Sequence, residues 1–115
     1  MKIGALKEIF IGEQRVALTP ESAAQLQKLG HECMIEKGAG KAAGFSDAQY
    51  KAAGVVVAAT AAALTKASDL IVKVRPPSEA EVKRLSATKT LISLFYPNEN
   101  TTLMELAQSK GASII

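Results

Sequence analysis

Short apolar runs alternate with more polar, helix-like stretches along the whole chain of 115 residues. The apolar runs contain few charges, which is typical of strands that are buried on both faces of a sheet. Most of the stretches between them begin with Ser or Thr, and several end at Gly, which are the signals that start and stop helices. The pattern predicts strands at 2–8, 31–38, 55–58, 68–74, 89–97 and 112–115, and helices at 20–30, 46–54, 78–85 and 98–111, with a further alanine-rich helix after residue 58.

Local capping signals support the first two predicted helices. Thr19 is a good N-cap, and Pro20 suits the first helical position because a proline there gives up no hydrogen bond. Ser46 repeats this logic for the second helix, while Gly30 and Gly54 are expected terminators. Both helices therefore have defined ends.

Continuous apolar strands that alternate with helices predict a parallel sheet covered by helices on both faces. We therefore expect a doubly wound α/β fold of the Rossmann or flavodoxin-like kind. The composition agrees, with 48% hydrophobic and only 4% aromatic residues. Because the chain stops inside the apolar run 111–115, which looks like a central strand, we expect 1–115 to be the N-terminal α/β domain of a longer protein.

Charge, cysteine content and apolar runs exclude several classes of function. A net charge of +3 comes from 14 basic and 11 acidic residues spread along the chain, without the basic stripe that nucleic acid requires. Cys33 is the only cysteine, so it predicts a buried thiol and not a disulfide or a metal pair. No apolar stretch reaches the ~18 residues of a membrane span, and no signal peptide is recognisable, so this chain reads as cytosolic.

Two features that resemble functional motifs favour plainer interpretations. The glycine-rich segment 38–44 follows a strand, but its spacing is G-x-G-x-x-x-G and the next helix begins only near Ser46, so we expect a loop and not a dinucleotide fingerprint. His31 has no Ser, Cys or metal partner nearby in the sequence and reads as a surface or cap residue. The sequence therefore predicts no acid–base catalyst and no metal site.

Polar residues gather where the predicted strands end. Arg15 follows the first strand, Lys73 and Arg75 close the fourth, and Tyr96 closes the fifth. Because the carboxyl ends of parallel strands share one edge, we expect the three cations to converge there, with tips exposed or bound to an anion and no carboxylate burying all three. Such cations bind carboxylate or phosphate, although the residues also fit ordinary loop positions.

Several segments, in this order, resemble one known family. They are "KIGALKE", "GEQRVALTPESAAQLQKLGHECMIEKGAG", "DAQYKAAGV", "ASDLIVKVRPP" and "LISLFYPNEN". Together they resemble the N-terminal domain shared by alanine dehydrogenase and the alpha subunit of proton-translocating NAD(P) transhydrogenase. The resemblance implies that Arg15 lies in a cleft facing a following Rossmann domain, where alanine dehydrogenases use it to grip the substrate carboxylate.

Two positions distinguish the branches of this family. Arg75 and Tyr96 stand where the resemblance places the substrate-binding lysine and the acid–base histidine of alanine dehydrogenases. An arginine does not become a neutral amine at working pH, and a tyrosine with a pKa near ~10 is a poor base. The resemblance thus favours the transhydrogenase branch, in which hydride passes from NADH to NADP⁺, coupled to proton translocation, without an acid–base residue.

The resemblance also implies the surroundings of this domain. NAD would bind mainly to a Rossmann domain beyond residue 115, NADP to a partner, the beta subunit or NADP-binding component, and the alpha component would form a homodimer. Other segments would associate with the membrane, which places this domain on the cytoplasmic side, peripheral to the inner membrane, and inactive alone. The alternatives are an alanine dehydrogenase-like amino-acid oxidoreductase and a non-enzymatic partner-docking module.

Overall fold

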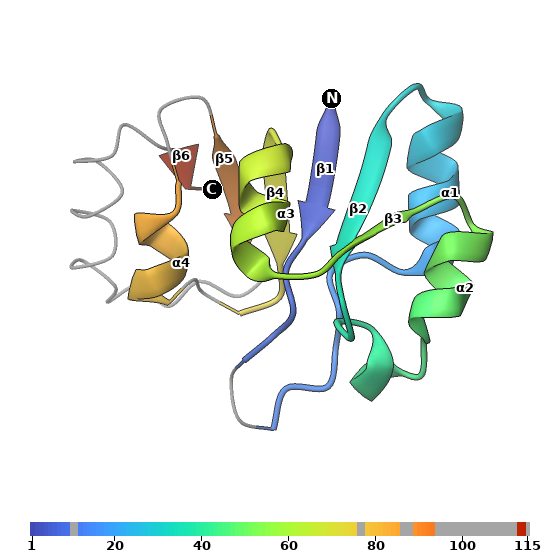
Figure 1. The fold of residues 1–115 in the computed structure, drawn as a ribbon, viewed down its shortest axis with the longest axis horizontal. Coiled ribbons are helices and arrows are strands. Elements are labelled where there is room, and N and C mark those ends of the chain that lie inside the picture. The colour runs from blue at the N-terminus through green and yellow to red at the C-terminus, as the bar shows by residue number, and fades with distance from the viewer. Residues whose placement is uncertain (10–11, 76–77, 86–88, 94–112, 115) are drawn as a thin grey trace.

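The computed structural model describes residues 1–9, 12–75, 78–85, 89–93 and 113–114. Its strands are β1 (Lys2–Ala5), β2 (Glu32–Glu36), β3 (Val56–Ala58), β4 (Leu70–Lys73), β5 (Thr90–Ser93) and β6 (Ser113–Ile114). They form one sheet in the order β3-β2-β1-β4-β5-β6, with every neighbouring pair parallel (Figure 1). This is the strand order of the Rossmann fold, so the predicted doubly wound sheet is confirmed.

The chain winds outward in both directions from the centre of this sheet. β1 pairs with β2 on one side and with β4 on the other, so the strand order reverses between β1 and β4. Among the described strands, β6 pairs only with β5, so Ser113 and Ile114, which belong to the run predicted as a central strand, lie at an edge of the described sheet. Ligands of open parallel sheets bind beyond the carboxyl ends at such a reversal, which is called the switch point.

The predicted helices form where their caps lie. They are α1 (Pro20–Lys28), α2 (Asp47–Ala52), α3 (Ala61–Ala67) and α4 (Glu79–Lys83). Thr19, Ser46 and Ser78 each begin a helix with a reciprocal capping box, which satisfies amide groups that the helix leaves unpaired. Thr60 caps α3 in a similar way, a cap that the sequence reading had not singled out. The helix predicted at 98–111 and the strand residues 94–97 lie outside the described residues.

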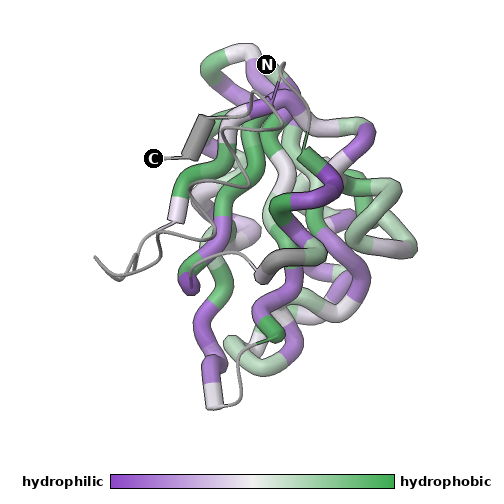
Figure 2. Tube along the Cα trace, turned by 90° about the vertical axis from the view of Figure 1, so that its left-hand side faces the viewer, coloured by the Kyte–Doolittle hydropathy of each residue, from purple (hydrophilic) through white to green (hydrophobic). Residues whose placement is uncertain are grey.

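Helices cover both faces of the sheet, each over its own hydrophobic core. One core, under α1 and α2, includes Ala23, Ile35 and Tyr50, and the other, under α3 and α4, includes Leu64 and Val82. Figure 1 shows α3 and α4 on the near side of the sheet, and Figure 2 shows hydrophobic and hydrophilic stretches alternating along the chain. Cys33 is buried in the first core, as its apolar context predicted.

The glycine-rich segment is a turn, as expected, and the structure explains one of its glycines. A short 3₁₀ helix, η1 (Lys41–Ala43), occupies its centre. A Cβ on Gly40 would come within 2.5 Å of the Tyr50 ring, so only glycine lets the loop lie against that ring. Tyr50 is fully buried, and its hydroxyl donates a hydrogen bond to the Leu18 carbonyl oxygen at 2.7 Å. Gly40 therefore serves packing and not the binding of a dinucleotide.

One predicted boundary is wrong in a way that matters for function. The first strand was expected to run to residue 8, but β1 ends at Ala5. The chain leaves the sheet there and forms the β1–α1 loop, which we define as residues 6–19. Glu8 turns from this loop toward the end of β4, where its carboxylate accepts backbone hydrogen bonds.

Candidate functional site

The β1–α1 loop and the end of β4 meet at the carboxyl edge of the sheet. β1 and β4 are hydrogen-bonded neighbours, with Ala5 opposite Val72, so the residues that follow them emerge side by side. In Figure 1 the arrowheads of both strands point toward this loop. The switch point of the sheet therefore lies between the loop and the end of β4.

The Glu8 carboxylate ties the loop to β4. Its Oε2 accepts a hydrogen bond from the Val74 amide at 2.9 Å. Its Oε1 accepts one from the Arg75 amide and one from Lys73 Nζ, both at 3.1 Å. The Glu8 side chain is only 3% exposed, so three hydrogen bonds replace its contacts with water.

Lys73 is the buried cation of the site. Its side chain is 1% exposed, and its Nζ lies 3.1 Å from Glu8 Oε1 and 3.5 Å from Glu81 Oε1. Glu81 also accepts a hydrogen bond from the Ser78 amide in the capping box of α4. The expectation that the Lys73 tip is exposed is therefore wrong, because two carboxylates enclose it and join the loop, β4 and α4.

Glu13 gathers the two arginines of the site. It binds Arg15 in bidentate fashion, with Arg15 Nε 2.9 Å from Oε2 and Arg15 Nη2 2.7 Å from Oε1. The Nε of Arg75 donates to the same Oε1 at 2.8 Å. Hydrogen bonds from the Arg15 side chain and backbone, and then from Arg75, hold the pKa of the Glu13 carboxyl far below its usual range. The same contact raises the pKa of Arg15.

Burial separates the charges of this cluster by sign. The carboxylate-bearing side chains of Glu8, Glu13 and Glu81 are at most 5% exposed. Arg15 and Arg75, by contrast, are 53% and 36% exposed. The cluster is formally neutral, but the groups that reach solvent are guanidinium ions. It therefore presents a cationic surface, suited to binding and orienting anions and not to moving protons.

The predicted convergence of Arg15, Lys73 and Arg75 is confirmed, and two of the three side chains are partly exposed. Tyr96 lies outside the described residues. Sequence reasoning missed the three acidic partners, Glu8, Glu13 and Glu81. Their only sequence signal is that acidic residues stand beside the predicted ends of strands and at the start of a helix. Glu8 and Lys73 are 65 residues apart, and no local pattern connects them.

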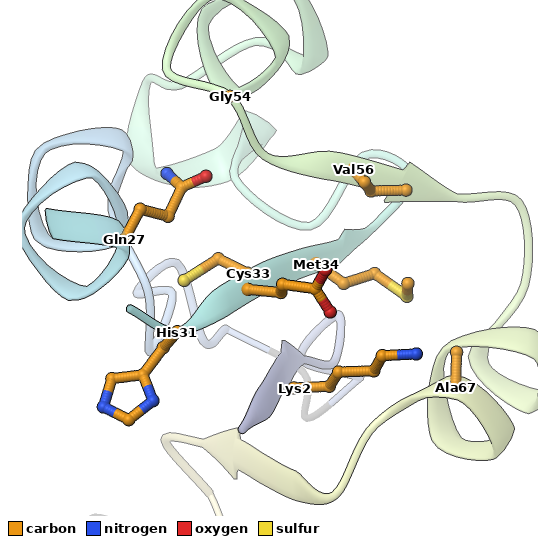
Figure 3. Close-up of a pocket in the computed structure, with 9 residues that line it drawn as sticks. Lys2, Gln27, His31, Cys33, Met34, Gly54, Val56 and Ala67 are labelled. Carbon is orange, nitrogen blue, oxygen red and sulfur yellow. The ribbon is translucent and has the colours of Figure 1, made fainter. Parts of the chain in front are cut away.

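A cavity of about 480 Å³ lies at the opposite, amino edge of the sheet (Figure 3). Cys33 and Met34 leave β2 in opposite directions there, and His31 and Gln27 stand on the Cys33 side. His31 Nδ1 is buried without a hydrogen bond to any described residue, and burial raises the pKa of the Cys33 thiol. The cavity is lined by polar as well as apolar side chains, and its one thiol has a raised pKa that disfavours the reactive thiolate, so we place no catalytic role in it.

Two further findings concern the described residues alone. No three side chains of His, Cys, Asp or Glu come together there in a way that suits a metal ion. None of the helices in this part of the chain is both long enough and apolar enough to cross a membrane.

Fold and cluster together define a doubly wound α/β domain with two partly exposed arginines at its switch point. Residues 4–115 match the family model described as "Alanine dehydrogenase/PNT, N-terminal domain", and the chain belongs to this family. It is 60% identical, over its whole length, to the NAD(P) transhydrogenase subunit alpha of Cereibacter sphaeroides, of which it covers 22%. It is 42% identical, again over its whole length, to the alanine dehydrogenase of Halomonas elongata, of which it covers 31%.

Solved structures show the same likeness. The transhydrogenase from Sinorhizobium meliloti superposes with a TM-score of 0.92 at 32% identity, over 99% of this chain and 34% of that one. An L-alanine dehydrogenase also gives 0.92, at 34% identity, over 100% of this chain and 32% of that one. The chain thus spans between about a fifth and a third of the length of these relatives.

Proposed function

We propose that this chain is the N-terminal domain of the NAD(H)-binding alpha component of a proton-translocating NAD(P) transhydrogenase. The observation that carries this proposal is Arg75, which is ion-paired with Glu13 where the family resemblance implies a substrate-binding lysine for amino-acid oxidation. A permanently charged guanidinium supports binding without proton exchange. The higher identity to a transhydrogenase subunit, 60% against 42%, supports the same branch.

The proposed chemistry asks for positioning and not for acid–base catalysis. Hydride passes directly between two nicotinamide rings, so the protein contributes by holding them in place and by its electrostatics. Arg15 and Arg75, as exposed cations at the switch point, raise the local concentration of the anionic dinucleotide and steer it. Segment 38–44 lacks a dinucleotide fingerprint, so this domain faces the cofactor while a Rossmann domain beyond residue 115 binds most of it.

The remaining parts of the proposal follow from the family. NADP is held by the partner, the beta subunit or NADP-binding component, and two alpha components form a homodimer. Other segments associate with the membrane, which places this domain on the cytoplasmic side, peripheral to the inner membrane. Within this scheme Arg15 and Arg75 have a supporting electrostatic role, and Tyr96 is a further cleft candidate.

The second candidate is an alanine dehydrogenase-like amino-acid oxidoreductase. The 42% identity to an alanine dehydrogenase and the exposed guanidinium of Arg15, which could bind a carboxylate, favour it. A non-enzymatic docking module is the third candidate, and it would use the same cationic surface for a protein partner.

One pair of assays on the full-length protein separates these candidates. We expect hydride transfer from NADH to an NADP⁺ analogue in the presence of the NADP-binding component. We expect no oxidation of NADH that depends on pyruvate and ammonium. Robust turnover in the second assay would assign the protein to the alanine dehydrogenase-like branch. No activity in either assay would favour the docking module.

Calorimetry of the 115-residue chain tests the assignment of NAD binding to a further domain. We expect no micromolar binding of NADH, because segment 38–44 cannot cradle a pyrophosphate. Micromolar affinity would show that the cofactor site lies within these residues and would contradict this part of the proposal.

A further inference from the structure

Two different carboxylates hold Arg75, one at its backbone and one at its side chain. Its backbone amide donates to Glu8 Oε1 at 3.1 Å, and its Nε donates to Glu13 Oε1 at 2.8 Å. Both carboxylates belong to the β1–α1 loop, although Arg75 itself follows β4. The guanidinium of Arg75 is therefore positioned relative to this loop, and so relative to Arg15, as well as to its own strand.

The two arginines differ in how they reach Glu13. Arg15 is two residues away, and its backbone amide and its side chain both bind that carboxylate, so this contact is local. Arg75 is 62 residues away and depends on the loop lying correctly against the end of β4. Glu8 contributes two of the hydrogen bonds that fix this alignment, through the amides of Val74 and Arg75.

Lys73 has a different task from the arginines. It lies 1% exposed beneath the surface, between Glu8 and Glu81, so it adds nothing to the cationic face that solvent meets. Its ammonium group compensates the buried Glu8 carboxylate, which would otherwise be costly to bury. Lys73 therefore stabilises the buried position of Glu8 and does not touch a ligand.

We propose that Glu8 is a positioning residue, which sets the Arg75 guanidinium beside Arg15, and that Lys73 is its buried counter-ion. The proposal deepens the proposed function, because it rests on the arginine pair being the surface that faces the dinucleotide. The positioning itself, however, is a property of this chain and is measured without any cofactor.

Glu8→Gln in the 115-residue chain tests the positioning directly. The amide retains the size of the carboxylate but replaces one of its two acceptor oxygens with a donor, so it cannot accept all three hydrogen bonds. The readout is solvent exchange of the arginine Nε–H protons, measured by NMR at a temperature where circular dichroism shows a folded chain. We expect the Arg75 Nε–H to exchange about tenfold faster, as for loss of a charged hydrogen bond, and the Arg15 Nε–H to be unchanged.

Glu21→Gln is the matched control, because Glu21 is exposed in the first turn of α1. It makes the same chemical change away from the cluster, and both Nε–H signals should remain as in the wild type. If Glu8→Gln lowers the melting temperature but leaves the Arg75 Nε–H unchanged, Glu8 is merely structural and the proposal is wrong.

A double variant separates charge from geometry. Glu8→Gln with Lys73→Met removes the buried carboxylate and its counter-ion together, so it should regain part of the thermal stability that Lys73→Met loses. Protection of the Arg75 Nε–H should not return, because no group then accepts from both amides. Return of that protection would mean that charge balance alone positions Arg75, which would overturn the proposal.

Kinetic assays of the full-length protein test whether the positioning of Arg75 by Glu8 matters for function. Glu8→Gln and Arg75→Ala should each raise the KM for NADH severalfold with a smaller change in kcat. If the NMR result holds but Arg75→Ala leaves this KM unchanged, the proposed function of the surface fails and the positioning by Glu8 stands. If Arg75→Ala raises the KM but Glu8→Gln does not, the positioning role fails and the function stands.

Discussion

The cluster at the switch point contains two ion-pair systems of opposite character, one built on Lys73, the last residue of β4, and the other on Arg75, two residues further on. Lys73 is enclosed by Glu8 and Glu81 and is nearly inaccessible, whereas Arg75 shares Glu13 with Arg15 and reaches solvent. The buried system connects three elements of the fold, and the exposed one presents charge outward. Similar ion pairs therefore support stability in one place and, in the function we propose, recognition of an anion in the other, and burial makes the difference.

The largest expected effect comes from breaking the buried system. Lys73→Met leaves Glu8 and Glu81 buried without their cation, and it should lower the free energy of unfolding by about 3–5 kcal/mol. Urea denaturation followed by circular dichroism measures this loss. Lys66→Met, at an exposed position in the last turn of α3, is the control and should change stability little. Equal losses in the two variants would show that the buried system contributes no special stability.

The second-largest effect on stability should come from the uncharged, buried hydrogen bond between Tyr50 and Leu18, at the far end of the β1–α1 loop. Tyr50→Phe leaves the Leu18 carbonyl without its donor, which should cost about 1–3 kcal/mol. Burial, and then the nearby Asp47 charge, raises the pKa of Tyr50 from 10.0 to about 12. The folded chain keeps this proton where the unfolded chain loses it, so the stability it contributes is present below pH 10 and is lost as the pH rises toward 12.

Denaturation curves of the wild type and of Tyr50→Phe across this alkaline range test that prediction. The stability of the wild type should fall more steeply than that of the variant, because the variant has no phenol to ionise. Parallel curves would show that Tyr50 titrates alike in the folded and unfolded chains.

Lowering the pH should have a smaller effect on stability, through the exposed ion pairs of Glu13 with Arg15 and Arg75. The pKa of Glu13 is lowered on folding, so its contribution is present above the unfolded value of 4.5 and is lost as the pH falls below it. Glu13→Gln should therefore flatten the acid limb of the stability curve, whereas Glu21→Gln should keep the wild-type shape. The effect is modest because solvent screens the arginine partners, and an unchanged limb in Glu13→Gln would contradict it.

The smallest effect on stability should come from Arg15→Ala. Its side chain is 53% exposed, and exposed ion pairs contribute little to folding. In the full-length protein the same change should modestly raise the KM for NADH while the melting temperature stays near that of the wild type. A large loss of stability would place Arg15 with the buried system and remove the contrast between the two.

The sequence predicted what local chemistry determines. The caps at Thr19 and Ser46 were identified correctly because a capping box is completed within four residues. The parallel sheet with helices on both faces followed from the alternation of apolar runs and helices, and topology then placed Arg15 and Arg75 at one edge. The family resemblance, and not the spacing, supplied the functional branch.

What the sequence could not predict depends on distant partners. The burial of Lys73 follows from Glu8 on the first loop and Glu81 on α4, and no periodicity links these positions. The early end of β1 depends on the same partners, because Glu8 turns away from the direction of β1 to accept hydrogen bonds from the Val74 and Arg75 amides, just after β4. We expected residues near strand ends to be exposed, and this was wrong for Lys73 because its acidic partners come from other elements across the switch point.

The reversal of strand order between β1 and β4 also bears on how the chain folds. β1, β2 and β3 follow one another in sequence and in the sheet, whereas β1 and β4 join residues such as Ile3 and Leu70 across more than half of the described chain. Closing so long a loop is slow, so β4 should dock on a preformed first half. The Glu8–Lys73 contact would then form after the rate-limiting step, and its loss should speed unfolding far more than it slows folding.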